Sequence, residues 1–341
     1  MLRYLNEHGI APYLTCSGIT PPWMCAADGV TLADLEGFCD MLVSLLVWAR
    51  REEGLRFTMF GPLNETDIGP PEGPFVSPEA YARVLALLDR KLNAIGLDDI
   101  RFVVAEQARF DTTYMRAILA EPAAARRVGV WGLHCYSEYS PEQLREVRDL
   151  AGTTPLWMTE YGDLEQSGER EWYVAWLMTG RLFDLLEGGF RGALVWDAFD
   201  NYHDHDEAWT IYGLLRTGLR VYTPKHRYYA AKQIFRFVPP GFVRVATMST
   251  HSGVRALAFT DAERRRVTVA VMNTAAETAY LNIDLHTYAL ELLHERATYY
   301  RTSAAERCAA VATIAVRGAN CPFRGLDATL PPYRIGTFTA G

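Results

Sequence analysis

The chain has 341 residues, a formal net charge of −7 and no long basic run. This charge balance argues against nucleic acid or an anionic membrane surface as the main partner. The length is enough for one large domain and one small one, and a hydrophobic content of 49% is enough for a sizeable core. No apolar stretch reaches the roughly 18 residues of a membrane span, and no signal peptide is visible at residues 1–9.

Strands and helices alternate along the first two thirds of the chain. Short apolar runs predict strands at 10–14, 57–60, 102–105, 130–133, 156–158 and 193–196. Helices are predicted at 32–49 after Thr31 as N-cap, from 78 to about 95, at 115–127, from 141 to about 151, at 171–187 and from 224 to 235. This alternation indicates parallel βαβ units in a barrel or a doubly wound sheet. The lack of a glycine-rich phosphate loop after any strand disfavours a nucleotide-binding sheet.

The number of predicted units is smaller than that of a complete barrel. A (β/α)8 TIM-type barrel has eight strands, whereas the sequence predicts six. Residues 1–9 have the pattern of a helix end that leads directly into the first strand. We therefore expect a barrel that lacks its first two units, with strands three to eight present.

The pattern changes after Pro239-Pro240-Gly241. Strands with two-residue alternation are predicted at 254–259, 266–272, 279–285 and 310–316, and helix signals are nearly absent. This pattern of short alternating strands favours a small antiparallel β-sandwich. We predict two domains, a barrel of residues 1–238 and a β-sandwich of residues 239–341.

The six cysteines show neither a CxxC motif nor zinc-ligand spacing. They are Cys16, Cys25, Cys39, Cys135, Cys308 and Cys321. Cys308 and Cys321 could form a disulfide within the last domain, and most of the six are expected to be buried thiols. Cysteine usage therefore does not fix the cellular compartment.

Two glutamates come directly after predicted strands. Glu65 follows the strand at 57–60, and Glu160 follows the strand at 156–158. In a parallel barrel the residues just past the strand ends converge on one mouth. Two carboxyl groups there are the equipment for cleaving a glycosidic bond, one as acid/base and the other as nucleophile or base. Glu106 also follows a strand, and for it we predict a structural hydrogen-bonding role.

These residues resemble those of a known group of enzymes. Asn64-Glu65 and Glu160 are similar to the acid/base and the nucleophile of the clan A retaining glycoside hydrolases. These are (β/α)8 barrels with the two glutamates after strands four and seven. The separation of 95 positions (160 minus 65) fits three intervening βα units.

Further positions agree with this resemblance. His134 and Tyr136 match a His-x-Tyr pattern after strand six, and Trp196 matches the strand-eight tryptophan that forms the floor of the sugar site. The run Pro21-Pro22-Trp23-Met24 and the trailing β-sandwich resemble family 30 most, with families 5 and 39 as close rivals.

The resemblance implies a sugar site that uses neither metal nor cofactor. Glu65 would be the protonated acid/base, and Glu160 the ionised nucleophile. The implied sugar-binding residues are Asn64, which would bond the 2-hydroxyl, and His134, Tyr136, Trp196, Trp23 and Asn201. The clan usually places an arginine after strand two, beside the nucleophile. Since no predicted strand precedes 10–14, we expect His134 or Tyr136 to orient Glu160 instead.

Residues 197–206 are dense in aspartate, asparagine and histidine. One interpretation is that they form the loop after strand eight and line the sugar cleft, with Asn201 among the contacts. The other is a divalent metal site, for which these side chains are suitable ligands.

The sequence thus predicts a retaining hydrolase of β-linked glycans. One alternative is a non-catalytic carbohydrate-binding protein built on an incomplete barrel. Another is a metal-dependent hydrolase that uses His203, His205 and Asp206. Glucan, xylan, galactan and glucosylceramide-like substrates all fit, with endo or exo action left open. The family resemblance suggests a secreted or periplasmic protein.

Overall fold

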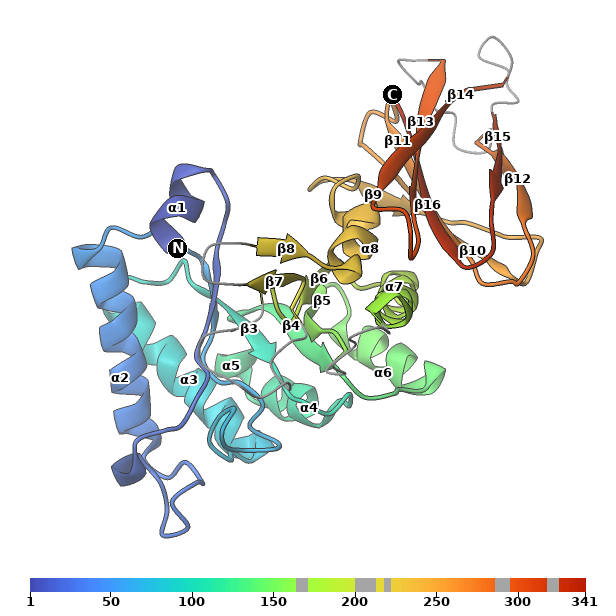
Figure 1. The fold of residues 1–341 in the computed structure, drawn as a ribbon. Coiled ribbons are helices and arrows are strands. Elements are labelled where there is room, and N and C mark those ends of the chain that lie inside the picture. The colour runs from blue at the N-terminus through green and yellow to red at the C-terminus, as the bar shows by residue number, and fades with distance from the viewer. Residues whose placement is uncertain (164–170, 200–212, 218–221, 286–294, 318–324) are drawn as a thin grey trace. The chain divides into compact units, whose positions relative to one another are not determined.

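The computed structural model describes residues 1–163, 171–199, 213–217, 222–285, 295–317 and 325–341 (Figure 1). The chain divides into two compact units. Residues 1–162 and 188–195 form the first unit, and residues 163–187 and 196–341 form the second. The predicted domain boundary between residues 238 and 239 stays a prediction.

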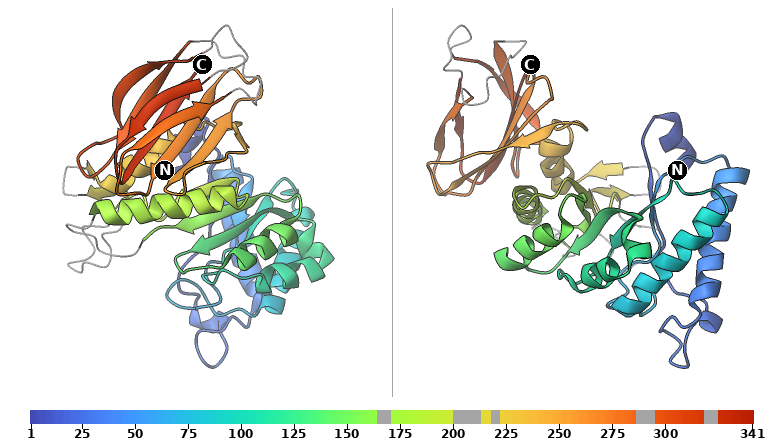
Figure 2. Two further views of the ribbon diagram at one scale, coloured as in Figure 1. Left: turned by 90° about the vertical axis from the view of Figure 1, so that its right-hand side faces the viewer. Right: turned by 180° about the vertical axis from the view of Figure 1, so that it is seen from behind.

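The first unit is built on a six-stranded parallel sheet in which the strands follow sequence order. Its strands are β1 (Tyr13–Thr15), β2 (Met59–Gly61), β3 (Arg101–Ala105), β4 (Val128–Cys135), β5 (Leu156–Tyr161) and β6 (Gly192–Val195). All six predicted strands are therefore present. The sheet is a curled half-barrel rather than a flat layer (Figures 1 and 2).

One helix of the first unit precedes β1, and the others lie between the strands in sequence. They are α1 (Leu2–Glu7), α2 (Leu35–Val47), α3 (Pro78–Ala94), α4 (Thr113–Ala120), α5 (Pro122–Ala125) and α6 (Pro141–Ala151), with a 3-10 turn η1 (Pro22–Met24) and a π-helical turn η2 (Trp48–Glu52). The apolar stripe of α3 is fully buried, from Tyr81 to Leu92. Ser77 and Ser140 cap α3 and α6 through their hydroxyl oxygens, as the Ser-Pro-Glu motifs predict.

Two predicted helices differ from the structure. Helix α2 begins after Asp34, whose carboxylate accepts a hydrogen bond from the Gly37 amide, and Thr31 instead forms a bridge with Phe75. The predicted helix at 115–127 is split into α4 and α5. Pro122 causes this break, because proline has no amide hydrogen for a continuing helix and suits the first position of a new one.

The described residues of the second unit form two helices and three antiparallel sheets. Its elements are α7 (Glu171–Glu187), β7 (Leu215–Thr217), β8 (Tyr222–Pro224), α8 (His226–Phe235), β9 (Val243–Val245), β10 (Val254–Thr260), β11 (Val267–Asn273), β12 (Ala279–Asp284), β13 (Arg296–Thr302), β14 (Ala309–Ala315), β15 (Gly325–Leu330) and β16 (Arg334–Ala340). The largest sheet has the order β14-β13-β16-β11-β10-β9, while β12 pairs with β15 and β7 with β8. The four antiparallel strands predicted from sequence are present.

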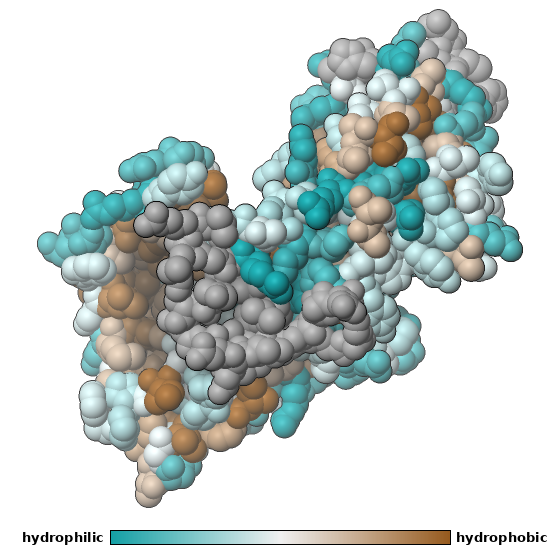
Figure 3. Space-filling view, viewed as in Figure 1, coloured by the Kyte–Doolittle hydropathy of each residue, from teal (hydrophilic) through white to brown (hydrophobic). Residues whose placement is uncertain are grey.

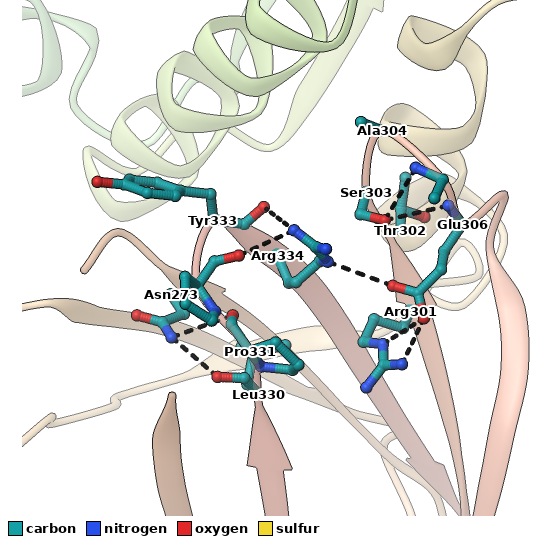
Figure 4. Close-up of polar contacts among 12 residues, drawn as sticks. Asn273, Arg301, Thr302, Ser303, Ala304, Glu306, Leu330, Pro331, Tyr333 and Arg334 are labelled. Atoms are coloured by element: carbon teal, nitrogen blue, oxygen red, sulfur yellow. Dashed lines mark hydrogen bonds and ion pairs between the residues drawn. The ribbon is translucent and has the colours of Figure 1, made fainter. Parts of the chain in front are cut away.

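Apolar and polar contacts together hold the C-terminal strands. One buried cluster includes Val269, Phe338 and Leu326. It joins the six-stranded sheet to the pair β12-β15. Hydrogen bonds and ion pairs fix the loops at the strand ends. Asn273 donates a hydrogen bond to the Leu330 carbonyl oxygen, and Arg301 forms an ion pair with Glu306 (Figure 4).

The expectation that most cysteines are buried thiols holds for three of the five cysteines among the described residues, since Cys16 and Cys25 are only partly buried. Cys39, Cys135 and Cys308 are buried. Cys308 carries a free thiol, and its predicted disulfide partner Cys321 lies outside the described residues. None of the described helices combines the length and the hydropathy that crossing a membrane requires.

A buried ion pair joins α3 to the start of β4. Arg127 donates from Nε to Asp89 at 2.6 Å and from Nη1 to the carbonyl oxygens of Leu97 and Ile100. The side chains of Arg127 and Asp89 are only 2% and 3% exposed. Loss of one partner would leave an uncompensated buried charge, which costs about 3–5 kcal/mol.

We therefore predict that Asp89→Ala lowers the free energy of unfolding by about 3–5 kcal/mol in urea denaturation. The matched control is Glu36→Ala, which breaks exposed pairs with Arg90 and Lys91. Exposed pairs contribute about 0–1 kcal/mol. Equal losses in the two variants would contradict the stabilising role of the buried pair.

Candidate active site

Four polar side chains meet at the carboxyl ends of neighbouring strands of the half-barrel. Glu65 follows β2 by four residues, and Glu106 comes directly after β3. His134 lies in β4 and Glu160 in β5, where the sheet register places them side by side. Parallel strands bring such residues to one edge, which is where barrels of this type hold their chemistry.

The backbone around Glu65 is held in a tight turn. Glu65 has a φ of 45°, in the left-handed region, and its side chain is buried. Its amide donates to the Glu106 carbonyl oxygen at 2.8 Å, and its own carbonyl accepts from the amides of Ile68 and Gly69. Because these bonds fix the backbone on both sides, the direction of the Glu65 carboxyl is set by local structure.

The loop after β2 is fastened to the loop after β3. The two carboxylate oxygens of Asp67 accept hydrogen bonds from the amides of Ala108 and Arg109, each at 2.9 Å. This pair of bonds spans about forty residues of sequence. It prevents the loop that carries Glu65 from moving independently of the loop that carries Glu106.

His134 lies between the two glutamates. Its Nδ1 is 2.6 Å from Glu65 Oε1 and 3.5 Å from Glu160 Oε2. The imidazole is fully buried. One carboxylate oxygen of each glutamate and a ring nitrogen of His134 all lie within 4.8 Å of one another.

Tyr136 holds the second glutamate from the other side. Its hydroxyl donates to Glu160 Oε2 at 2.8 Å. Its ring meets that of His134 edge to face, with centroids 6.4 Å apart. The expectation that His134 or Tyr136 orients Glu160 agrees with these contacts. Among the described residues, no lysine or arginine forms an ion pair with Glu160.

Burial and neighbouring charge determine the protonation of this cluster. Burial raises the pKa of Glu160 to about 7, and the charges of Glu65 and Glu106 add to this, while His134 and the Tyr136 hydroxyl oppose it. Burial by itself would lower the pKa of His134, but the Glu65 hydrogen bond and the charges of Glu160 and Glu106 outweigh it and raise the pKa. The predicted ionised state of Glu160 therefore prevails only above about pH 7.

Glu65, His134 and Glu160 are a set of groups that could also hold a divalent metal ion. Two donors at about 2.0–2.1 Å from one tetrahedral zinc ion stand roughly 3.3 Å apart. The separation of 2.6 Å between Nδ1 and Glu65 Oε1 is too short for that and is typical of a charge-assisted hydrogen bond. The arrangement therefore fits proton sharing better than metal coordination.

The other residues predicted for the site lie in different surroundings. Asn64 is buried, and its Oδ1 has no hydrogen-bond partner among the described residues. Trp23 lies in η1 and is 78% exposed; apolar side chains are visible on the surface of the first unit in Figure 3. Trp196 is 41% exposed and belongs to the second unit. Asn201, His203, His205 and Asp206 lie outside the described residues.

Sequence analysis missed one member of the cluster. The Tyr13 hydroxyl donates to Glu106 Oε2 from the first strand of the sheet. A polar side chain at an inward position of a buried strand would have been a signal for it. Tyr13 belongs to the run at 10–14, whose apolar character predicts a strand but does not predict this contact.

Comparison with known proteins shows the fold. No family model and no curated protein sequence matches the chain. Solved structures do match. The family 30 subfamily 8 xylanase Xyn30A from Clostridium acetobutylicum has a TM-score of 0.74 at 16% identity, over 99% of this chain and 82% of that one. A family 30 endoxylanase from Clostridium papyrosolvens gives 0.73 at 19% identity, over 100% and 82%. The endo-β-1,6-glucanase BT3312 gives 0.71 at 16%, over 99% and 74%.

The raised pKa of Glu160 predicts a pH-dependent cost to stability. Between its ordinary value of 4.5 and about 7, the folded state binds more protons than the unfolded chain, so stability falls as the pH rises through this window. Glu160→Gln removes the titration. We expect the free energy of unfolding of the variant, measured by urea denaturation at pH 8, to exceed that of the wild type by about 3 kcal/mol. At pH 4.5 the two values should be nearly equal.

The control for this measurement is Glu142→Gln. An Arg145 hydrogen bond lowers the pKa of this exposed carboxyl, so its removal has the opposite sign and should not stabilise the protein at pH 8. If Glu160→Gln were no more stable at pH 8 than at pH 4.5, relative to the wild type, the raised pKa would be wrong.

Proposed function

We propose that the protein is a retaining glycoside hydrolase that cleaves β-linked glycans, with Glu65 as acid/base and Glu160 as nucleophile. The observation that carries this proposal is the approach of a buried carboxyl group, Glu65, and a partly buried one, Glu160, to within 4.8 Å at the strand ends. Retaining enzymes hold their carboxyl groups about 5–5.5 Å apart, whereas inverting enzymes need about 6.5–9.5 Å for a water molecule.

The first chemical step uses both glutamates at once. Ionised Glu160 attacks the anomeric carbon and forms a glycosyl ester, while Glu65 gives its proton to the departing glycosidic oxygen. The Tyr136 hydroxyl and the charged His134 ring face the nucleophile. They favour the ionised form of Glu160 that the attack requires.

The second step reverses these roles. Glu65, now a carboxylate, takes a proton from a water molecule as the water attacks the anomeric carbon, and the ester bond to Glu160 breaks. Asn64 is placed directly before the acid/base, with an unsatisfied buried Oδ1 among the described residues. A sugar hydroxyl, in our assignment the 2-hydroxyl, would supply the missing hydrogen bond, which strengthens in the transition state.

The fold comparison supports a choice of substrates to test. The matching proteins include xylanases and an endo-β-1,6-glucanase, so oligosaccharides of these types are the first substrates to test. We further infer that the C-terminal strands form a β-sandwich domain that follows a barrel of strands three to eight.

The decisive test is hydrolysis of aryl β-glycosides and β-glycan oligosaccharides. We expect Glu160→Gln to lose turnover by roughly 10⁴-fold or more, because no ester can form, while Glu142→Gln retains it. Glu65→Gln should lose most on substrates with poor leaving groups, which depend on proton donation. Activity that survives in Glu160→Gln would overturn the assignment.

The pH dependence of kcat/KM is a separate prediction. Because Glu160 must be ionised, kcat/KM should fall as the pH drops through about 7. Tyr136→Phe removes a hydrogen bond to the ionised form, so this acidic limb should move to higher pH by up to about one unit. Tyr299→Phe, which removes a hydroxyl that donates to the Thr329 carbonyl oxygen in the second unit, should leave the limb in place. A limb that stays fixed in Tyr136→Phe would contradict the proposed contact.

Two other functions have distinguishable outcomes. A carbohydrate-binding protein would bind the oligosaccharides without turnover in both the wild type and Glu160→Gln. A metal-dependent hydrolase would lose its activity with a chelator and regain it with added metal. The glycosidase proposed here is indifferent to chelation, because its steps use carboxyl groups alone.

A further inference from the structure

Glu106 is a buried carboxyl group that the proposed steps do not use. It comes directly after β3 and is 1% exposed. The Tyr13 hydroxyl donates to its Oε2, and the hydroxyls of Thr15 and Thr159 also interact with it. Burial raises the pKa of Glu106. Hydroxyl groups of two other strands, β1 and β5, thus contribute to the surroundings of this side chain.

Room for this side chain is built into two neighbouring strands. A Cβ atom at Gly132 of β4 would collide with Glu106 Oε1, and one at Gly61 of β2 would lie 2.6 Å from the Tyr13 hydroxyl. Glycine is needed at both positions because the polar pair fills the space where side chains would stand. The pair is therefore a specific feature of the sheet interior.

The backbone of Glu106 is connected directly to the acid/base. Its amide donates to the Gly132 carbonyl at 2.9 Å, and its carbonyl accepts from the Glu65 amide at 2.8 Å. Glu106 has a φ of 58° and Glu65 a φ of 45°. Left-handed conformations of residues other than glycine cost of order 1–3 kcal/mol and persist where the surroundings hold them.

We propose that Glu106 is a positioning residue for the proposed reaction, whose anchored side chain fixes the backbone that holds the general acid Glu65. Its bond to Tyr13 keeps the left-handed turn in place. The carbonyl of that turn then holds the Glu65 amide, and the Glu65 carboxyl stays within reach of His134. This inference rests on the proposed function.

The test compares substrates that need an acid with substrates that do not. Phenyl and dinitrophenyl β-glycosides of the sugar that the wild type hydrolyses differ in leaving-group ability, and only the poor phenyl leaving group depends on protonation. We expect Glu106→Ala to lower kcat/KM about 10²-fold on the phenyl substrate and less than about 10-fold on the dinitrophenyl substrate. Glu106→Gln, which keeps an acceptor for Tyr13, should restore both values to within about 3-fold of the wild type.

Tyr13→Phe provides a second variant in case Glu106→Ala does not fold. It should lower kcat/KM about 10-fold on the phenyl substrate with little change on the dinitrophenyl substrate. The control is Tyr299→Phe, since the Tyr299 hydroxyl donates to the Thr329 carbonyl oxygen within the second unit. This control should follow the wild type on both substrates.

Losses of equal size on the two substrates, in Glu106→Ala or in Tyr13→Phe, would overturn the inference, because general damage to the fold lowers both rates alike. Such a result leaves the proposed function intact as long as Glu160→Gln remains inactive. A wild type without turnover, or an active Glu160→Gln, overturns the proposed function and this inference with it.

Discussion

The hydrogen bond between His134 Nδ1 and Glu65 Oε1 is the interaction on which the site depends. Two carboxylates whose facing oxygens lie within 4.8 Å repel each other by at least about 3 kcal/mol at an effective dielectric constant of 20. Burial adds the cost of removing both charges from water. A proton on the imidazole between them offsets part of both terms. Without His134, the two glutamates would share the site only with at least one of them neutral.

That compensation is incomplete, and the remainder appears as the raised pKa of Glu160. In the proposed mechanism Glu160 must be ionised, so its resistance to ionisation lowers the stability of the folded state at the pH where it would react. Such a conflict between stability and activity is common where function requires a strained or destabilised group. The left-handed backbone of Glu65 and Glu106 adds a second local cost at the same end of the sheet.

Local patterns predicted the parts of this arrangement that depend on local physics. Apolar runs located all six parallel strands, and their ends located Glu65 and Glu160. The capping hydroxyls of Ser77 and Ser140 predicted two helix starts.

Strands β13 and β16 were not predicted, because arginine, threonine and glycine interrupt their apolar alternation. The bond from Tyr13 to Glu106 joins residues 93 positions apart, so no local pattern contains it. The pKa of Glu160 depends on burial and on three distant charged groups, which exist only in the folded chain.

The proton count of the cluster explains why histidine suits this position. When protonated, His134 is the group that offers a positive charge to Glu160 within the described part of this chain. Arginine keeps its charge at any working pH, but histidine can lose it. In the proposed reaction Glu160 is ionised, and a charged His134 ring with its Nδ1 3.5 Å away offsets that charge. A buried site tolerates such a neutral pair better than a lone charge. A histidine therefore couples the ionisation of Glu160 to its own protonation, which an arginine at this position would not do.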